Sequence, residues 1–310
     1  MKSFFKFAGI AAVALSATLG AQSASADTEL RIGTASLGGA YYPMGQALSV
    51  NVNNFADGYT MVPIVTGGGG ENPRLVASGE VDVALAPASL SFLAVGGKGP
   101  YKEALNIQAL GALHSSVLHM VTLPGNGIDS IADLKGRTVA VGPAGGGTLG
   151  LMRNLFKLYG MTMDDVTPSF LSYADGMSQL ADGNVDASFA LAGYPTGAVA
   201  QISATNELKF IELGGDKMQE VVDTYSFYTS VEFPAGTYGN DAPVSVIGSP
   251  NLLIANGDMD PDLAESITQA IYGNMDALIA ENALAGKIVP EQSLALPIPL
   301  HAGAAAFHNK

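Results

Sequence analysis

Two segments with the same arrangement, Gly79-Glu80-Val81-Asp82-Val83-Ala84 and Gly183-Asn184-Val185-Asp186-Ala187-Ser188, decide the fold of this chain. In each segment a glycine ends a helical pattern, and an apolar run begins soon afterwards, as where a strand follows a helix. Apolar runs without polar alternation are typical of strands in parallel sheets buried on both faces. Asp82 and Asp186, at the starts of these strands, are expected to cap the local backbone rather than to catalyse a reaction.

Each segment is preceded by a strand, a glycine-rich loop and a helix. In the first half, a strand predicted over residues 30–34 leads into the loop at 35–39. In the second half, residues 138–142 lead in the same way into the loop at 143–147. This order of elements is that of a βαβ unit. The sequence therefore predicts an α/β protein with two similar lobes, each with a mostly parallel sheet.

Two further strand-like runs connect the halves. They cover residues 119–123 and 244–254, and the second is interrupted near Gly248-Ser249-Pro250. Two hinge strands of this kind allow rigid lobes to close around a cleft. An amphipathic helix over 263–278, introduced by Asp260-Pro261, is expected to return to the first lobe. The predicted boundaries are 27–117 plus 246–310 for lobe 1, which is discontinuous, and 118–245 for lobe 2.

The first 26 residues are typical of a signal peptide. Lys2 and Lys6 frame the start of an apolar segment, residues 7–19, which is too short to span a bilayer. Ala24-Ser25-Ala26 offers a cleavage site, so the mature protein is expected to begin at Asp27 in a periplasm. A retained membrane anchor is the alternative. The chain has no cysteine, which excludes disulfides, thiol nucleophiles and lipid attachment through an N-terminal cysteine.

Acidic residues dominate the charge of the chain. There are 28 Asp and Glu against 14 Lys and Arg, giving a formal net charge of −14. A chain this acidic is not expected to bind nucleic acid or anionic lipid through its general field, so an anionic ligand must be attracted locally. The length of 310 residues suits two ordinary domains, and a monomer is expected.

Three glycine-rich loops mark the expected ligand site. They cover residues 34–42, 66–72 and 142–148, and each follows a strand and leads into a helix. Open parallel sheets bind ligands at such carboxyl ends of strands. Glycine exposes main-chain N–H groups and helix N-termini favour negative charge, so the prediction is a small organic anion between the lobes. Tight turns without a ligand are the alternative for each loop. The predicted ligand-binding residues are Thr34, Ser36, Tyr41, Tyr42, Gly69, Gly70, Ser89, Gly146, Gly147, Thr148 and Tyr194.

Catalytic, metal and cofactor motifs are not recognisable. The four histidines, His114, His119, His301 and His308, form neither a zinc motif nor a nucleophile–base pattern. Gly145-x-Gly147-x-x-Gly150 has the form of a dinucleotide fingerprint, but the acidic partner that the fingerprint needs is poorly placed. We therefore expect no metal, no cofactor and no enzymatic activity.

Longer motifs give a family resemblance over nearly the whole mature chain. They are RIGTASLGGAYYPMGQAL, VTGGGGENPRLVASGEVDVAL, ADLKGRTVAVGPAGGGT, LADGNVDASFALAGYPT and LPIPLHAGA. With these motifs the chain resembles the TAXI (TRAP-associated extracytoplasmic immunogenic) solute-binding proteins of TRAP transporters. The resemblance implies a type II periplasmic-binding-protein fold, the permease subunits of a sodium-coupled TRAP transporter as partners, and ligands such as glutamate, glutamine and related dicarboxylates.

The chain departs from the TAXI pattern in the pocket loops. Gly69 and Gly146 stand where that family usually has serine, and Pro87-Ala88-Ser89 stands where it tends to have Gln-Ser-Asp. Fewer polar side chains satisfy fewer polar ligand atoms, which predicts a carboxylate-bearing ligand that is bulkier or less polar than glutamate. Three alternatives remain open at this point: a binding protein for a membrane sensor, one for an ATP-driven importer, and an enzyme on the same scaffold.

Overall fold

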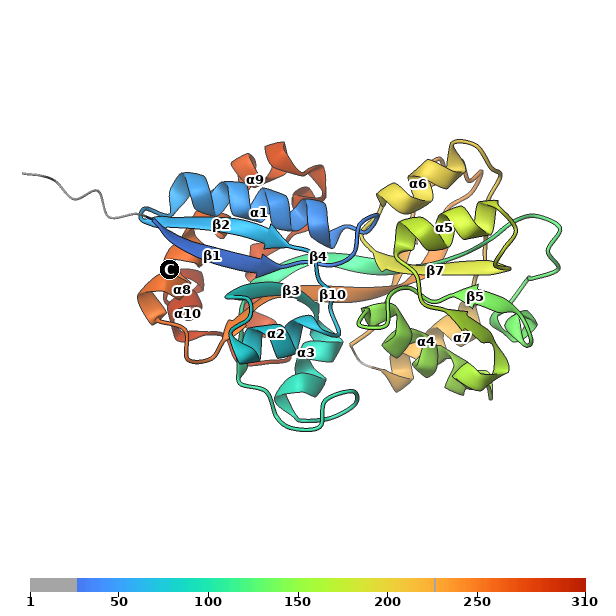
Figure 1. Cartoon of the computed structure of the whole chain (residues 1–310), viewed down its shortest axis with the longest axis horizontal. Helices are drawn as coiled ribbons and strands as arrows, with labels where there is room; N and C mark the ends of the chain where they lie inside the picture. The colour runs from blue at the N-terminus through green and yellow to red at the C-terminus, as the bar shows by residue number, and fades with distance from the viewer. Residues whose placement is uncertain (1–26, 226) are drawn as a thin grey trace, which may run out of the picture.

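The structure, a computed structural model, describes residues 27–225 and 227–310 (Figure 1). The predicted signal peptide, residues 1–26, therefore lies outside the described residues. Over the described ranges the chain forms one mixed sheet in the order β2-β1-β3-β10-β4-β7-β5-β6, with β8 beside β4 and β9 beside β10. No helix in these ranges is long and apolar enough to cross a membrane. The strands are β1 (Thr28–Gly33), β2 (Tyr59–Ile64), β3 (Val83–Pro87), β4 (Ile107–Thr122), β5 (Thr138–Ala140), β6 (Thr167–Ser169), β7 (Ala187–Ala192), β8 (Lys209–Phe210), β9 (Thr229–Phe233) and β10 (Val244–Asn256).

Helices cover both faces of this sheet. In lobe 1, α1 and α9 lie on one face and α2 and α3 on the other, and in lobe 2, α5 and α6 lie opposite α4 and α7 (Figure 1). The predicted two-lobed α/β architecture is thus confirmed. The helices are α1 (Tyr41–Phe55), α2 (Asn72–Ser78), α3 (Ala88–Val95), α4 (Gly147–Leu158), α5 (Tyr173–Ala181), α6 (Gly197–Ser203), α7 (Gly215–Thr224), α8 (Pro261–Tyr272), α9 (Met275–Glu281) and α10 (Ala302–His308).

Two long antiparallel strands join the lobes, so the sheet of one lobe continues into the other. β1 is parallel to β2 and β3 in lobe 1, and β5 is parallel to β6 and β7 in lobe 2. β10 pairs with β3 at one end and with β9 at the other, while β4 runs beside it. The predicted connecting runs are therefore strands. The register shifts between Ser249 and Asn251, because Pro250 has no N–H to offer the ladder.

Residues near both ends of the described part of the chain build the core of lobe 1. Leu30, Ile32 and Met44 are buried in one cluster with Ile267 from α8 and Ala304 from α10. In lobe 2 the buried cluster around Phe156 and Phe189 comes from the middle of the chain. The C-terminal helices thus return to lobe 1, as predicted. The exact boundaries, 27–117 plus 246–310 and 118–245, stay a proposal.

Backbone caps fix the starts of two equivalent strands. Asp82 Oδ2 accepts a hydrogen bond of 2.7 Å from Arg31 N, and Asp186 Oδ2 accepts one of 2.8 Å from Thr138 N. Asp82 and Asp186 are caps, as predicted. The helix expected over 263–278 is instead two helices, α8 and α9, separated at Gly273 and Asn274. Gly273 is the C-cap of α8 with a right-handed φ of −76°, and its N–H still makes the helical bond to Gln269 O at 3.0 Å, so the apolar periodicity did not reveal the break that follows.

Candidate functional site

The two lobes touch through their glycine loops. Gly145 O of lobe 2 accepts hydrogen bonds from Gly70 N at 2.9 Å and from Glu71 N at 3.1 Å of lobe 1. At a second contact, Gly38 O of lobe 1 accepts bonds from Ala198 N at 3.0 Å and Thr196 Oγ1 at 2.9 Å. Main chain thus meets main chain across the cleft, and the lobes are closed on each other.

A small cavity, here called the glycine-loop cavity, remains between these contacts. Its volume is about 20 Å³, and its walls include Ser36, Tyr41, Gly69, Gly146 and Gly147. A cavity of this size holds about one water molecule. The N–H of Gly70, predicted to hold an anion, is already bonded to Gly145 O. With the lobes closed in this way, the crevice predicted from the glycine loops has no room for an organic ligand.

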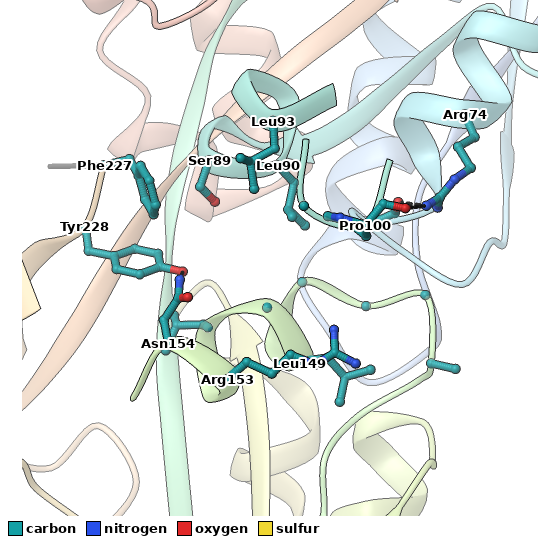
Figure 2. Close-up of a pocket in the computed structure, with 18 residues that line it drawn as sticks. Arg74, Ser89, Leu90, Leu93, Pro100, Leu149, Arg153, Asn154, Phe227 and Tyr228 are labelled. Carbon is teal, nitrogen blue, oxygen red and sulfur yellow. Dashed lines mark hydrogen bonds between the residues drawn. The ribbon is translucent and has the colours of Figure 1, made fainter. Parts of the chain in front are cut away.

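A much larger cavity opens on the other side of the Gly70–Gly145 contact, and we call it the interlobe cavity. Its volume is about 540 Å³, within the usual range for a small-molecule site. Arg74, Ser89, Leu90 and Leu93 lie on the lobe 1 side, on α2 and α3, as Figure 2 shows. The lobe 2 side carries Leu149, Arg153 and Asn154 on α4 together with Phe227 and Tyr228 (Figure 2).

Arg74 is held in place by three groups of lobe 1. Its guanidinium donates to Gly70 O at 3.1 Å and to Pro100 O at 2.6 Å. It also lies 4.7 Å from the ring centroid of Tyr101, a cation–π distance. Tyr101 in turn donates to Gly70 O at 3.1 Å. A guanidinium has five N–H donors, so these bonds orient Arg74 and still leave donors for a ligand.

Arg153 faces Arg74 from the opposite lobe. It is an exposed side chain of α4, and within the described ranges it has no hydrogen bond or ion pair to another side chain. The adjacent Asn154 donates to Tyr228 Oη at 3.2 Å. Burial raises the pKa of Tyr228 to about 12, so its hydroxyl stays protonated even well above neutral pH. Among the described residues of this wall, Arg153 is thus a cation without a side-chain partner, next to a fixed polar pair.

The charge of the interlobe cavity is opposite to that of the molecule. Two arginines line it, and among the described lining residues there is no Asp or Glu. The N-terminal turns of α3 and α4 contribute Ser89, Gly147 and Gly150 to its wall. Helix N-termini carry partial positive charge and unpaired N–H groups. The arrangement therefore suits an anion.

The predicted site residues divide into three groups. Gly70, Ser89, Gly146 and Gly147 line the interlobe cavity. Ser36, Tyr41 and Gly69 line the glycine-loop cavity, together with Gly146 and Gly147. The other predicted residues line neither cavity; they are Thr34, Tyr42, Thr148 and Tyr194.

Contacts within the protein explain why most of the residues in this last group line neither cavity. Thr34 Oγ1 donates to Ile64 O at 2.7 Å, so it joins two loops of lobe 1. Thr148 Oγ1 lies 2.7 Å from Tyr173 Oη inside lobe 2. The Tyr194 ring lies under Lys287 Nζ, 3.2 Å from the ring centroid. These hydroxyl-bearing side chains bond or pack within the protein rather than facing either cavity.

Sequence reasoning missed the two arginines of the interlobe cavity. A signal was present, because the chain has only four arginines and two of them, Arg74 and Arg153, stand in the helices that follow glycine loops. Phe227 and Tyr228 carried no comparable signal, since only the tertiary fold brings residues between α7 and β9 to α3 and α4.

A buried polar cluster lies behind the glycine-loop cavity, where α1 meets the hinge strands. Tyr41 Oη donates to Asn251 Oδ1 at 2.6 Å, and Asn251 Nδ2 donates to His114 O at 2.7 Å and Ser116 Oγ at 2.8 Å. These bonds join α1 to β10 and β4. Within the described part of the chain, no group of three or more His, Asp or Glu side chains is arranged to hold a metal ion.

Solved structures with the same architecture include a protein from Bordetella bronchiseptica RB50. It shares 18% identity with this chain, covers 90% of this chain and 92% of its own, and has a TM-score of 0.56. A binding protein component of an ABC phosphonate transporter from Pseudomonas aeruginosa shares 10% identity, with 83% and 79% coverage and a TM-score of 0.53. These likenesses show the periplasmic-binding-protein fold, as predicted.

The predicted TAXI membership is corrected by the comparisons. The family model that matches is that of the NMT1-like family, over residues 32–309, and the similar structures include a component of an ABC transporter. Most of the motifs behind the TAXI resemblance cover strands, glycine loops and helices of the shared fold, whereas the departures at Gly69 and Gly146 lie in loops that line the two cavities. Family membership agrees with the expectation of a binding protein and not an enzyme. The chain belongs to the NMT1-like family.

Proposed function

We propose that this chain is a periplasmic solute-binding protein that captures a small organic anion in the interlobe cavity and delivers it to the membrane subunits of an ABC-type importer. The observation that carries the proposal is the pair Arg74 and Arg153, one from each lobe, across a cavity of about 540 Å³. Because one cation belongs to each lobe, a bound anion favours closure of the lobes.

Local charge supports an anion as the ligand. The whole chain has a formal net charge of −14, so its general field repels anions. A cavity whose described lining has two arginines and no acidic side chain is the exception to that field. Arginine binds carboxylate, phosphonate and sulfonate oxygens with two parallel hydrogen bonds. The ligand head group we propose belongs to this class of oxyanions.

Different observations support the ABC-type importer as the partner and the periplasm as the compartment. The similar structure from Pseudomonas aeruginosa is a binding component of an ABC transporter, which supports an ABC-type importer here. The basic and apolar start of the chain supports export to the periplasm. The expectation of a ligand less polar than glutamate was based on the TAXI pattern. Because the chain belongs to the NMT1-like family, that pattern no longer supports it. The apolar wall of Leu90, Leu93 and Phe227 now supports it independently.

Arginine substitutions test the proposed site. Isothermal titration calorimetry of the mature protein against three-carbon phosphonates, sulfonates and carboxylates should identify at least one binding class. Arg74→Gln and Arg153→Gln should each weaken that binding by about tenfold or more, because each removes a charge-assisted hydrogen bond. Arg31→Gln is the matched control. Arg31 lies on β1, pairs with Asp82 and does not line the interlobe cavity. Unchanged affinity in both cavity variants would exclude the site.

A further inference from the structure

A second cavity, which we call the hinge cavity, lies beside the interlobe cavity. Its volume is about 470 Å³. It lies between α3, the hinge strands β4 and β10, and the segment after the 3₁₀ helix Pro290–Ala295. Among its described lining residues none is charged, and most are apolar, including Phe92, Leu113, Leu252, Leu296 and Pro297. Phe92 leaves 47% of its surface exposed, a large apolar area in the cavity wall.

The two cavities are neighbours separated by one side chain and one helix. Phe227 lines both of them. On α3, Ala88 and Phe92 line the hinge cavity, whereas Ser89 and Leu93 line the interlobe cavity. In Figure 2, Phe227 and Arg74 lie at opposite ends of the interlobe cavity, with Leu90 and Leu93 between them. An apolar wall therefore extends from the two arginines to Phe227, and Phe227 also lines the apolar hinge cavity.

The position of Phe227 is fixed by its aromatic neighbours. Its ring centroid lies 4.7 Å from that of Tyr228 in an edge-to-face arrangement and 6.0 Å from that of Tyr225. Tyr228 is in turn held by Asn154 of α4. These ring distances are typical of aromatic pairs. Phe227 thus offers a pre-positioned apolar surface between the cavities.

We propose that the ligand is an amphipathic anion, with its oxyanion head between Arg74 and Arg153 and an alkyl or aryl group that lies along Leu90 and Leu93 and continues past Phe227 into the hinge cavity. This inference rests on the proposed function, since the same cavity holds the head group. Burial of apolar area then supplies part of the affinity, and the uncharged hinge cavity excludes ligands with a second charge at the far end.

A chain-length series tests this inference. The affinity of the mature protein for n-alkylphosphonates, from methyl to octyl, is measured by isothermal titration calorimetry. We expect affinity to rise by about fourfold for each added methylene that becomes buried. A doubly charged α,ω-diphosphonate of the same length should bind more weakly than the octyl compound. Equal affinity along the series would overturn the inference while leaving the proposed function intact. If no alkylphosphonate binds, the series is repeated with alkylsulfonates and alkylcarboxylates, and a failure of all three classes to bind would overturn both.

Two phenylalanine variants locate the apolar part of the ligand. Phe227→Ala should lower the gain per methylene from the middle of the series onward, and Phe92→Ala should lower it only for the longest chains. Phe170→Ala is the matched control, because Phe170 is 53% exposed and lines neither cavity. A gain per methylene that is the same in Phe227→Ala, Phe92→Ala and the control would overturn the proposed path.

Discussion

Two buried histidines of β4 stay neutral in the folded protein. Burial, with a smaller effect from the Lys287 charge, lowers the pKa of His114 to about 3. In the described part of the structure neither of its ring nitrogens has a hydrogen-bond partner, so nothing compensates the cost of a charge there. Burial also lowers the pKa of His119 to about 4, although its ring lies 2.8 Å from Tyr238 Oη and 3.2 Å from Ala190 O.

These histidines make the protein less stable in acid. In the unfolded chain each has an ordinary pKa near 6.5, so between pH 7 and pH 5 the unfolded chain takes up protons that the folded protein refuses. The free energy of unfolding should therefore decrease when the pH is lowered from 7 to 5, by about 2 kcal/mol per histidine. Urea denaturation at pH 7 and pH 5 measures the loss. His114→Met should remove about half of the part that His114 and His119 contribute. An identical pH dependence in this variant would contradict the prediction.

At the scale of elements, the βαβ units were predictable because their signals are local. Gly79, with φ of 75°, ends α2 in the left-handed region that glycine favours, and the sequence pattern places it correctly. The break between α8 and α9 was not predicted. Apolar spacing continues through Gly273, while the bonds that favour the break come from the distant Asn51, which donates to Ala270 O and Asn274 O. The apolar periodicity of a segment does not reveal hydrogen bonds to a residue more than 200 positions away, such as Asn51.

The strand caps at Asp82 and Asp186 give a prediction about the same units. Each carboxylate accepts a backbone N–H and lies near an arginine, Arg31 at 3.7 Å or Arg137 at 3.4 Å. Asp82→Ala and Asp186→Ala should each lower the free energy of unfolding by about 1 kcal/mol, because a charge-assisted bond is lost at a partly exposed position. Ligand affinity should stay the same in both. Chemical denaturation and calorimetry on the same samples distinguish this result from a role in binding.

At the scale of the whole molecule, sequence predicted the two lobes but not where the space between them lies. The glycine loops were expected to face an open crevice. Their lack of side chains instead lets Gly70 and Gly145 approach until their main chains bond, at 2.9 Å, which leaves about 20 Å³ between the loops. The larger space lies beyond this contact, beside Arg74 and Arg153. Whether glycines surround a ligand or each other depends on how the lobes meet, which no local pattern encodes.

The same contact predicts how closure can be blocked. A Cβ added at Gly70 would lie 2.6 Å from Gly145 O, and its three nearest atoms all belong to lobe 2. Gly70 has no positive φ, so Gly70→Ala fits lobe 1 itself and clashes only when the lobes close. Such overpacking costs about 1–3 kcal/mol, so ligand affinity should fall by about 5- to 150-fold.

Gly286→Ala is the control for this variant, because its Cβ would meet nothing within 4 Å. Small-angle X-ray scattering should show the mature protein becoming more compact with ligand in this control, and much less so in Gly70→Ala at the same ligand concentration. The melting temperature without ligand should be equal in both, since opening relieves the clash. If Gly70→Ala bound ligand as tightly as the control and closed as fully, the contact between Gly70 and Gly145 would not belong to the ligand-bound state.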